Sequence, residues 1–218
     1  VSAGTTYYIE ISSFDASPTN PSLQLNAAFG ISNIPLSWVG GVAIQSDQPI
    51  VAVGRPHIGT EVASYIGATQ GSTTQYVPML FKGAFGGGYN AALYVQNISG
   101  SSANLTMEFT DSSGTVVYTK TDTLGANASK GYWLPSEADL PAGFAGGVKV
   151  TSDQPILAVG RPHINGQVMT YNGMGSGSDT AWLPMFFKNA FGNYNTALYI
   201  QNVTRSEEHT SELQSRQV

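Results

Sequence analysis

Short stretches in which apolar and polar residues alternate recur along most of this chain. The clearest is Leu105-Thr-Met-Glu-Phe109, whose alternation places Leu105, Met107 and Phe109 on one face. Residues 91–96, 129–134 and 145–151 have the same character and are separated by turn-forming Gly, Asn, Asp and Ser residues. No stretch shows the 3.6-residue period of an amphipathic helix, so the pattern predicts an all-β protein of short antiparallel strands.

The chain also repeats itself. Residues 40–58 return as residues 146–164 with 15 of 19 positions identical, at a constant offset of 106 residues. Pro78-Met-Leu-Phe-Lys82 returns as Pro184-Met-Phe-Phe-Lys188, and Leu93-Tyr-Val-Gln-Asn97 returns as Leu198-Tyr-Ile-Gln-Asn202 at an offset of 105. A period near 100 residues is too long for a solenoid repeat and fits a small β-sandwich. The sequence therefore predicts tandem antiparallel β-sandwich repeats of immunoglobulin-like type, about 106 residues each, with a small β-barrel as the alternative.

These offsets divide the chain into parts of three repeats. Residues 1–70 are expected to be the C-terminal part of a first repeat, residues 76–173 a complete repeat, and residues 181–204 the N-terminal strands of a third. The segments at residues 67–74 and 172–179 are rich in Gly and Ser, and we expect flexible linkers there. Within the complete repeat, Ser152-Asp-Gln-Pro155 is expected to form a hairpin turn.

Residues 205–218 break this pattern. Arg205-Ser-Glu-Glu-His-Thr-Ser-Glu-Leu-Gln-Ser215 is charged and polar where the repeat predicts strands, and it resembles the translation of a widely used sequencing adapter. The alternative is a genuine acidic tail or short helix, since Glu and Leu are good helix formers. We expect a non-native tail without function, and we expect the natural N-terminus to precede Val1, which is not a methionine.

Composition excludes several classes of partner. Only 11% of the residues are charged, the net charge is −5 and Lys and Arg total 9, so no basic surface for nucleic acid is expected. The chain has no cysteine, which excludes disulfides and thiolate metal sites. It also has no run of about 18 apolar residues, so no membrane span is predicted.

The best polar constellation combines Asp, Arg and His, and it occurs twice. It comprises Asp47, Arg55 and His57 in the first copy and Asp153, Arg161 and His163 in the second. Such groups can build a hydrolytic site, but each Asp lies in a turn-forming Ser-Asp-Gln-Pro segment, and the set occurs once per repeat. We therefore expect Arg55, His57, Arg161 and His163 to contact a neighbouring domain. We expect no catalytic residue, cofactor or metal, because one His per repeat supplies too few ligands.

Aromatic residues offer a second kind of site. Tyr132 and Trp133 are adjacent in a predicted strand, and an aromatic ring can stack on the apolar face of a sugar. Further candidates for such a platform are Phe85, Tyr89, Tyr94, Trp182 and Tyr194. The competing interpretation is that one of Tyr132 and Trp133 faces the core while the other covers the sheet, because neighbours in a strand point to opposite faces.

Several features together form a recognisable pattern over about residues 22–204. They are the period, the Leu-Tyr-(Val/Ile)-Gln-Asn strand, the Asp111-Ser-Ser-Gly114 turn, the Leu140-Pro-Ala-Gly143 segment and the Ser-Asp-Gln-Pro-Ile segment. The pattern resembles immunoglobulin-like repeat domains of large secreted or surface proteins of environmental bacteria, notably filamentous Chloroflexota-type organisms. This resemblance implies an extracellular or cell-surface, non-enzymatic module with a structural or adhesive role. Its partners would be neighbouring repeats, other surface proteins or glycans. The alternatives are a carbohydrate-binding module and an accessory domain of a secreted enzyme whose catalytic domain lies outside this sequence.

Overall fold

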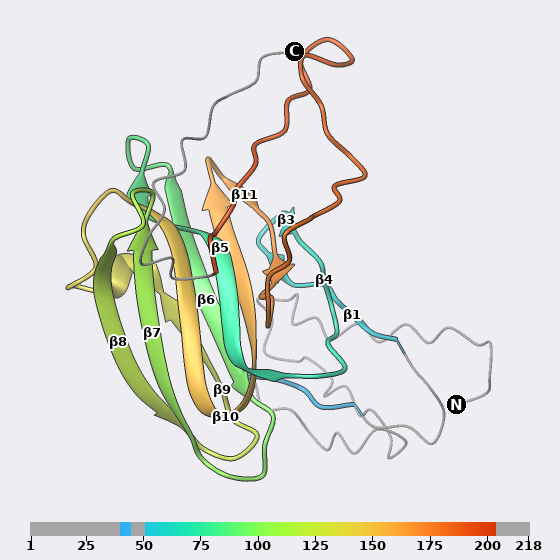
Figure 1. Ribbon diagram of the computed structural model, residues 1–218. Coiled ribbons are helices and arrows are strands. Elements are labelled where there is room, and N and C mark those ends of the chain that lie inside the picture. The colour runs from blue at the N-terminus through green and yellow to red at the C-terminus, as the bar shows by residue number, and fades with distance from the viewer. Residues whose placement is uncertain (1–39, 45–50, 204–218) are drawn as a thin grey trace, which may run out of the picture.

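The computed structural model describes residues 40–44 and 51–203 (Figure 1). Asp47, most of the predicted first repeat (residues 1–39) and the tail at residues 205–218 lie outside the described residues. The strands are β1 (Val53–Gly54), β2 (His57–Ile58), β3 (Glu61–Val62), β4 (Tyr65–Ile66), β5 (Ser72–Ala84), β6 (Tyr89–Asn97), β7 (Ala103–Asp111), β8 (Val116–Leu124), β9 (Ser129–Trp133), β10 (Phe144–Ile164), β11 (Gln167–Val168) and β12 (Tyr171–Asn172). One 3₁₀ turn, η1 (Leu134–Ser136), follows β9, and the described residues contain no α-helix. The prediction of an all-β, antiparallel protein is confirmed.

The long strand β10 organises the sheet because its two halves have different neighbours. Its first half lies between β7 and β5, and β8 pairs with β7 on the far side. We call these strands the β8 ladder. Its second half pairs with β6, which pairs in turn with β9, and the short strands β11 and β12 also pair with β10; we call this group the β9 ladder. Figure 1 shows β10 running behind β7 and beside β5 toward β6 and β9. One strand therefore links the two ladders.

The core lies where both ladders contribute their inward side chains. Leu105, Met107 and Phe109 of β7 are buried, as the alternation of that strand predicts. Leu93 and Val95 of β6 belong to the same hydrophobic cluster. The cluster also includes Val77, Leu80, Leu124, Tyr132, Leu134, Leu140, Phe144, Val148, Val150 and Ile156. Its members come from every strand between β5 and β10, so burying them fixes all these strands together.

The predicted hairpin turn at Ser152-Asp-Gln-Pro155 is wrong. These residues lie inside β10, and the segments on either side pair with other strands rather than with each other. Thr151 pairs with Thr74 and Ile156 with Ser72, so the ladder with β5 shifts register across this segment. A register shift accommodates a Pro, which lacks a donor N–H, without reversing the chain. The turn-like residues therefore mark the place where β10 passes from one ladder to the other.

Both predicted linkers are wrong where they adjoin the complete copy. Ser72 to Thr74 already belong to β5. Beyond β12, the Gly173 N–H donates to Ala158 O, and Met174 exchanges backbone hydrogen bonds with Tyr76. The Gly- and Ser-rich composition of these segments predicts flexibility, but their backbone N–H and C=O groups have hydrogen-bond partners in the neighbouring strands.

The described part of the first copy repeats the local structure of the second at an offset of 106. Val53 pairs with Ile66 as Val159 pairs with Asn172, and His57 pairs with Val62 as His163 pairs with Val168. The N–H of Ala63 donates to Pro56 O, and the N–H of Met169 donates to Pro162 O. Equivalent residues of the first and second copies thus form the same strand pairings.

Gly54 and Gly160 are needed because a tyrosine ring covers each of them. A Cβ on Gly160 would lie 2.6 Å from Cζ of Tyr171, and Tyr65 covers Gly54 in the same way. The Tyr171 ring has little freedom to move, since its hydroxyl donates to Met79 O and accepts from Met79 N, both at 2.9 Å. This contact ties β12 to β5 and gives a structural reason for the glycine in Gly-Arg-Pro-His.

Residues 187–196 of the third copy likewise repeat the turn between β5 and β6. The N–H of Gly83 donates to the Asn90 side chain, and the N–H of Asn189 donates to the Asn195 side chain. Three aromatic rings meet edge to face in both turns: Phe81, Phe85 and Tyr89 in one, and Phe187, Phe191 and Tyr194 in the other. Phe85 and Phe191 share an unusual positive φ, 50° and 47°.

Candidate functional site

Four of the side chains predicted as functional gather on the outer face of the β9 ladder. Ala92 of β6 lies between Trp133 of β9 and Arg161 of β10, since it is the register partner of both. The Arg161 guanidinium carbon lies 5.3 Å from the centroid of the Tyr94 ring. The His163 and Trp133 rings meet edge to face with centroids 5.2 Å apart. We call Tyr94, Trp133, Arg161 and His163 the aromatic–cationic face.

The two basic side chains of this face each have a nitrogen without a described hydrogen-bond partner. Nε of Arg161 and Nε2 of His163 are buried and have no hydrogen-bond partner among the described residues. Burial, followed by the positive charge of Arg161, lowers the pKa of His163, and Glu61 partly opposes this shift. His163 is therefore held toward its neutral form. Buried polar groups normally have partners, and these two nitrogens have none among residues 40–44 and 51–203.

The first copy lies beside this face. Nδ2 of Asn172 donates to Ile66 O at 2.6 Å, which joins β12 to β4. Gly41 is so close to the Gln96 side chain that a Cβ at this position would collide with it. Figure 1 shows β3 next to β11. Glu61 of β3 is the first-copy charge that acts on His163.

The structure separates Asp153 from Arg161 and His163. Asp153 follows the part of β10 that pairs with β7, whereas Arg161 and His163 lie in the part that pairs with β6. The Asp153 carboxylate accepts from the backbone N–H and the side-chain amide of Asn104, both at 2.8 Å, and these bonds lower its pKa. The Asp–Arg–His constellation therefore does not form a catalytic site in the second copy. In the first copy Arg55 is exposed.

Tyr132 and Trp133 point to opposite sides, as the competing interpretation of this pair predicts. Trp133 is 39% exposed, whereas Tyr132 is buried in the core. A buried ring offers no face to a sugar, so of this pair only Trp133 remains as a stacking residue. The Tyr132 hydroxyl instead donates to Oδ2 of Asp122 at 3.0 Å.

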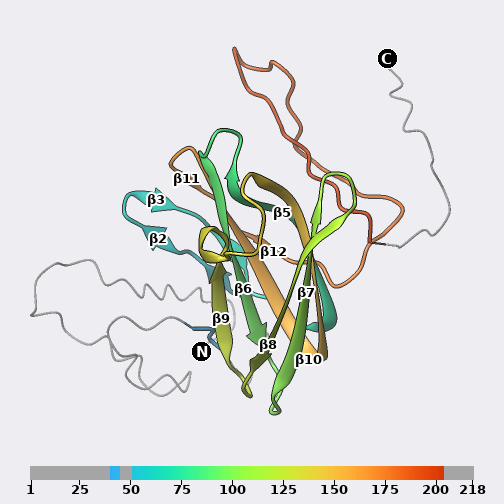
Figure 2. The same ribbon diagram turned by 90° about the vertical axis from the view of Figure 1, so that its left-hand side faces the viewer.

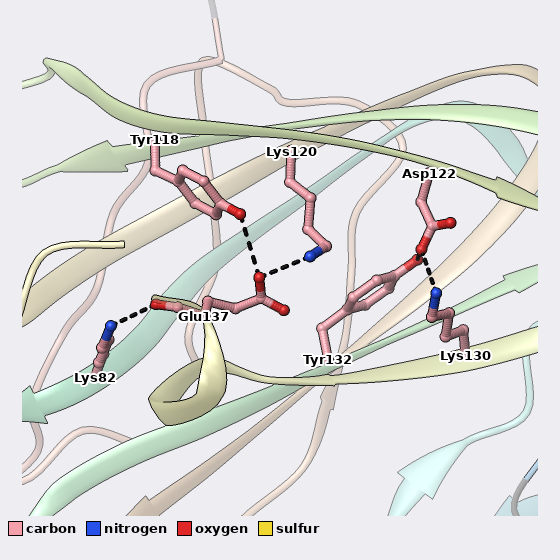
Figure 3. A network of polar contacts seen from close by, with 7 residues as sticks. All are labelled: Lys82, Tyr118, Lys120, Asp122, Lys130, Tyr132 and Glu137. Atoms are coloured by element: carbon pink, nitrogen blue, oxygen red, sulfur yellow. Dashed lines mark hydrogen bonds and ion pairs between the residues drawn. The ribbon is translucent and has the colours of Figure 1, made fainter. Parts of the chain in front are cut away.

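Asp122 belongs to a polar network that the sequence did not reveal (Figure 3). Lys120 Nζ lies 2.7 Å from Oε2 of Glu137, which also accepts from the Tyr118 hydroxyl, and Lys130 Nζ lies 2.6 Å from Oδ2 of Asp122. Lys82 Nζ donates to the backbone oxygens of Glu137 and Leu140. Figure 2 shows β8 and β9, which carry much of this network, next to each other. We call the six side chains of Tyr118, Lys120, Asp122, Lys130, Tyr132 and Glu137 the polar seam, since they join the edge strands β8 and β9.

The charges of the polar seam support one another. Hydrogen bonding to Glu137 raises the pKa of Lys120. Burial raises the pKa of Asp122, but hydrogen bonds from Lys130, the Thr123 backbone and Tyr132 outweigh this effect, so the net pKa is lowered. Lys120 and Asp122 therefore both stay ionised near neutral pH. A signal was present in the sequence, because Tyr118, Lys120 and Asp122 alternate with threonines along β8.

Two further features are absent from residues 40–44 and 51–203. No group of three or more His, Asp or Glu side chains is arranged to hold a metal ion in this part of the chain. Nor does this part include a helix with the length and apolar character needed to cross a membrane.

Comparisons with known proteins give a limited result. No family model matches the chain, and no curated protein does. A solved structure described as "Crystal Structure of Thermotoga maritima 1070" aligns with a TM-score of 0.40 and 15% identity, over 49% of this chain and 96% of its own. The Anabaena sensory rhodopsin transducer aligns with a TM-score of 0.35 and 16% identity, over 42% of this chain and 97% of its own. These values assign neither a family nor a function.

Proposed function

We propose that this chain is part of an extracellular or cell-surface bacterial protein built from tandem immunoglobulin-like β-sandwich repeats. Its role is structural or adhesive rather than enzymatic. Each repeat acts as a folded spacer, and contacts between successive repeats set the stiffness and reach of the array. The partners are neighbouring repeats, together with other surface proteins or glycans.

The observation that carries this proposal is the repetition of local structure on both sides of the complete copy. Strand pairings before it and a turn after it recur with the same partners at offsets of 106 and 105 residues. In repeat proteins each unit contacts mainly its neighbours. The hydrogen bond from Asn172 to Ile66 is such a contact between the second and first copies.

A pulling experiment on the whole 218-residue chain, held at its two ends, tests the mechanical role. We expect one cooperative rupture that releases the roughly 100 residues from Ser72 to Met174, a contour-length gain of about 350 Å. The Leu105→Ala variant, which leaves a cavity in the core, should lower the rupture force, whereas the exposed Thr119→Ala variant should not. Smooth extension without a discrete event would contradict a spacer role.

Glycan binding is the second candidate. The exposed ring of Trp133, which lies beside Arg161 and His163, favours it. Retention of the chain on insoluble polysaccharides measures it. Trp133→Ala should abolish retention while the far-ultraviolet circular dichroism stays unchanged. Phe191→Ala is the matched control, because this ring is also exposed but lies in the turn of the third copy and is not a candidate for the platform. Equal retention of both variants and the parent would exclude Trp133 as the platform.

A further inference from the structure

Residues 199–203 of the third copy lie along strand β5 of the second. The Tyr199 ring meets the Phe81 ring of β5 edge to face, with centroids 5.8 Å apart. The carbonyl oxygen of Val203 accepts a hydrogen bond from the Tyr76 hydroxyl of the same strand at 3.3 Å. Phe81 is 1% exposed although it does not belong to the core cluster, so its ring is covered from the outer side of the module. The third copy supplies part of this cover.

A glutamine of the third copy also covers a glycine of the second. Gln201 lies over Gly147, near the start of β10, and a Cβ on this glycine would be 3.0 Å from Cδ and Oε1 of the glutamine. Oε1 of Gln201 is itself buried. Gly147 is not among the glycines with a positive φ. The close approach of its neighbours, rather than its backbone conformation, is therefore the reason for a glycine at this position.

The same contact joins the first and second copies. Gly41 is equivalent to Gly147 at the offset of 106, and Gln96 is equivalent to Gln201 at the offset of 105. A Cβ on Gly41 would collide with Gln96, whose Cδ, Nε2 and Oε1 are the three nearest atoms. Gln96 belongs to β6, whereas Gln201 is not in a strand, so the contact does not depend on the local secondary structure of the glutamine. Equivalent residues thus meet in the same pair at both junctions.

From this recurrence we infer that the two junctions are one interface used twice, in which the glutamine of each copy docks on the β10 glycine of the copy before it. The second copy uses two different surfaces, because Gln96 faces the first copy while Gly147 and β5 face the third. A contact between two different surfaces continues head to tail. The partner of each surface is therefore the neighbouring repeat of the same chain, held at a fixed angle that gives the array a regular twist. This inference deepens the array role proposed above and rests on it for any further copies.

Distances between pairs of spin labels, measured by double electron–electron resonance, test whether both junctions are rigid. The chain has no cysteine, so labels attach only where a cysteine is introduced. Ser64→Cys with Thr119→Cys spans the first junction, and Thr119→Cys with Asn193→Cys spans the second. All three residues are exposed. We expect one narrow distance distribution for each pair in the whole 218-residue chain.

Gly41→Val and Gly147→Val act as controls for each other. Each should broaden the distribution at its own junction roughly twofold and leave the other junction unchanged, because the added side chain displaces the glutamine. Adding Gln96→Ala to the first variant, or Gln201→Ala to the second, should restore the narrow distribution. A side chain at Gly147 also meets Val77 O, at 3.1 Å, but this conflict lies within the module and lowers its urea midpoint with or without Gln201.

Broad distributions in the parent chain would overturn the inference. So would a Gly41→Val variant that keeps a narrow distribution at the first junction, or a broadening that the glutamine substitution does not reverse. A discrete rupture in the pulling experiment together with broad distributions here would overturn this inference alone and leave the spacer role in place.

Discussion

The polar seam and the aromatic–cationic face are both clusters of charged and aromatic side chains on one module, yet they differ in how far their polar groups are paired. In the polar seam, both carboxylates accept hydrogen bonds from a lysine and a tyrosine. On the face, Arg161 and His163 each bury a nitrogen without a hydrogen-bond partner among the described residues. The two clusters meet at β9, where Tyr132 of the polar seam and Trp133 of the face are neighbours in sequence.

This difference separates a group whose carboxylates are paired within the module from one whose buried nitrogens lack a described partner. A satisfied polar network stabilises a fold and specifies its geometry, whereas an unsatisfied buried group requires an explanation outside its immediate surroundings. The first copy lies beside the face, since Asn172 donates a hydrogen bond to Ile66 O and the charge of Glu61 acts on His163. The comparison therefore predicts that the polar seam controls stability and that the face controls contacts.

Removing Glu137 should have the largest effect. Glu137→Ala leaves Lys120 and Tyr118 without their shared acceptor, and all three groups are partly buried. We expect the free energy of unfolding to fall by about 2–3 kcal/mol, measured by urea denaturation followed by tryptophan fluorescence. Glu108→Ala is the control, because its ion pair with Lys149 is longer, 3.6 Å, and more exposed, so it should change stability by less than about 0.5 kcal/mol. Equal losses in both variants would remove the special role of the polar seam.

Tyr132→Phe sharpens the comparison by removing one hydroxyl and leaving the ring in the core. Asp122 keeps its contact with Lys130, so we expect a smaller loss of about 1 kcal/mol. Tyr94→Phe removes a hydroxyl from the opposite side of the same ladder and should be nearly neutral in the same denaturation experiment. A larger loss from Tyr94→Phe would place a stabilising network on the face and contradict the distinction.

Asn172→Ala tests whether the first copy is held beside the face independently of the module. The variant loses the hydrogen bond to Ile66 O. Amide exchange of residues 51–66 should become several-fold faster, as expected for a net loss near 1 kcal/mol. Exchange in β6 and β7 should not change. Faster exchange throughout the module would show that Asn172 stabilises the complete copy instead.

The strands of the module could be predicted from sequence because each depends on local alternation. Leu105, Met107 and Phe109 are buried together as expected, and the repeated Tyr194 and Asn195 recur in the same turn as Tyr89 and Asn90. The segment from Ser152 to Pro155 has the composition of a turn, but β10 continues through it, since its two halves find partners in different ladders. Long-range pairing overrode local preference at this point.

The two polar clusters depend on strand order, which alternation does not reveal. Arg161 and Trp133 meet because β6 lies between β10 and β9, and Lys120 reaches Glu137 because β8 lies beside the turn after β9. The sequence identified Arg161, His163 and Trp133 individually, since they belong to a repeated motif or to a conspicuous aromatic pair. The alternation of Tyr118, Lys120 and Asp122 with threonines marks one face of β8, but it does not identify Glu137, an ordinary turn residue, as the partner of Lys120.

The smallest expected effect concerns the charge of His163. Burial and Arg161 hold its pKa below 6.5 in the folded chain, so the unfolded chain binds the proton first as pH falls. Stability should therefore decrease between pH 7 and pH 5.5, and His163→Gln should remove this contribution, as measured by denaturation across that range. Arg161→Ala should weaken the dependence, because it removes one of the two causes of the lowered pKa and leaves burial. A stability that instead rises with acidity in a His163-dependent way would mean that Glu61 pairs with a protonated His163. The face would then be satisfied by the first copy, as the polar seam is within the module, and the contrast between the two clusters would disappear.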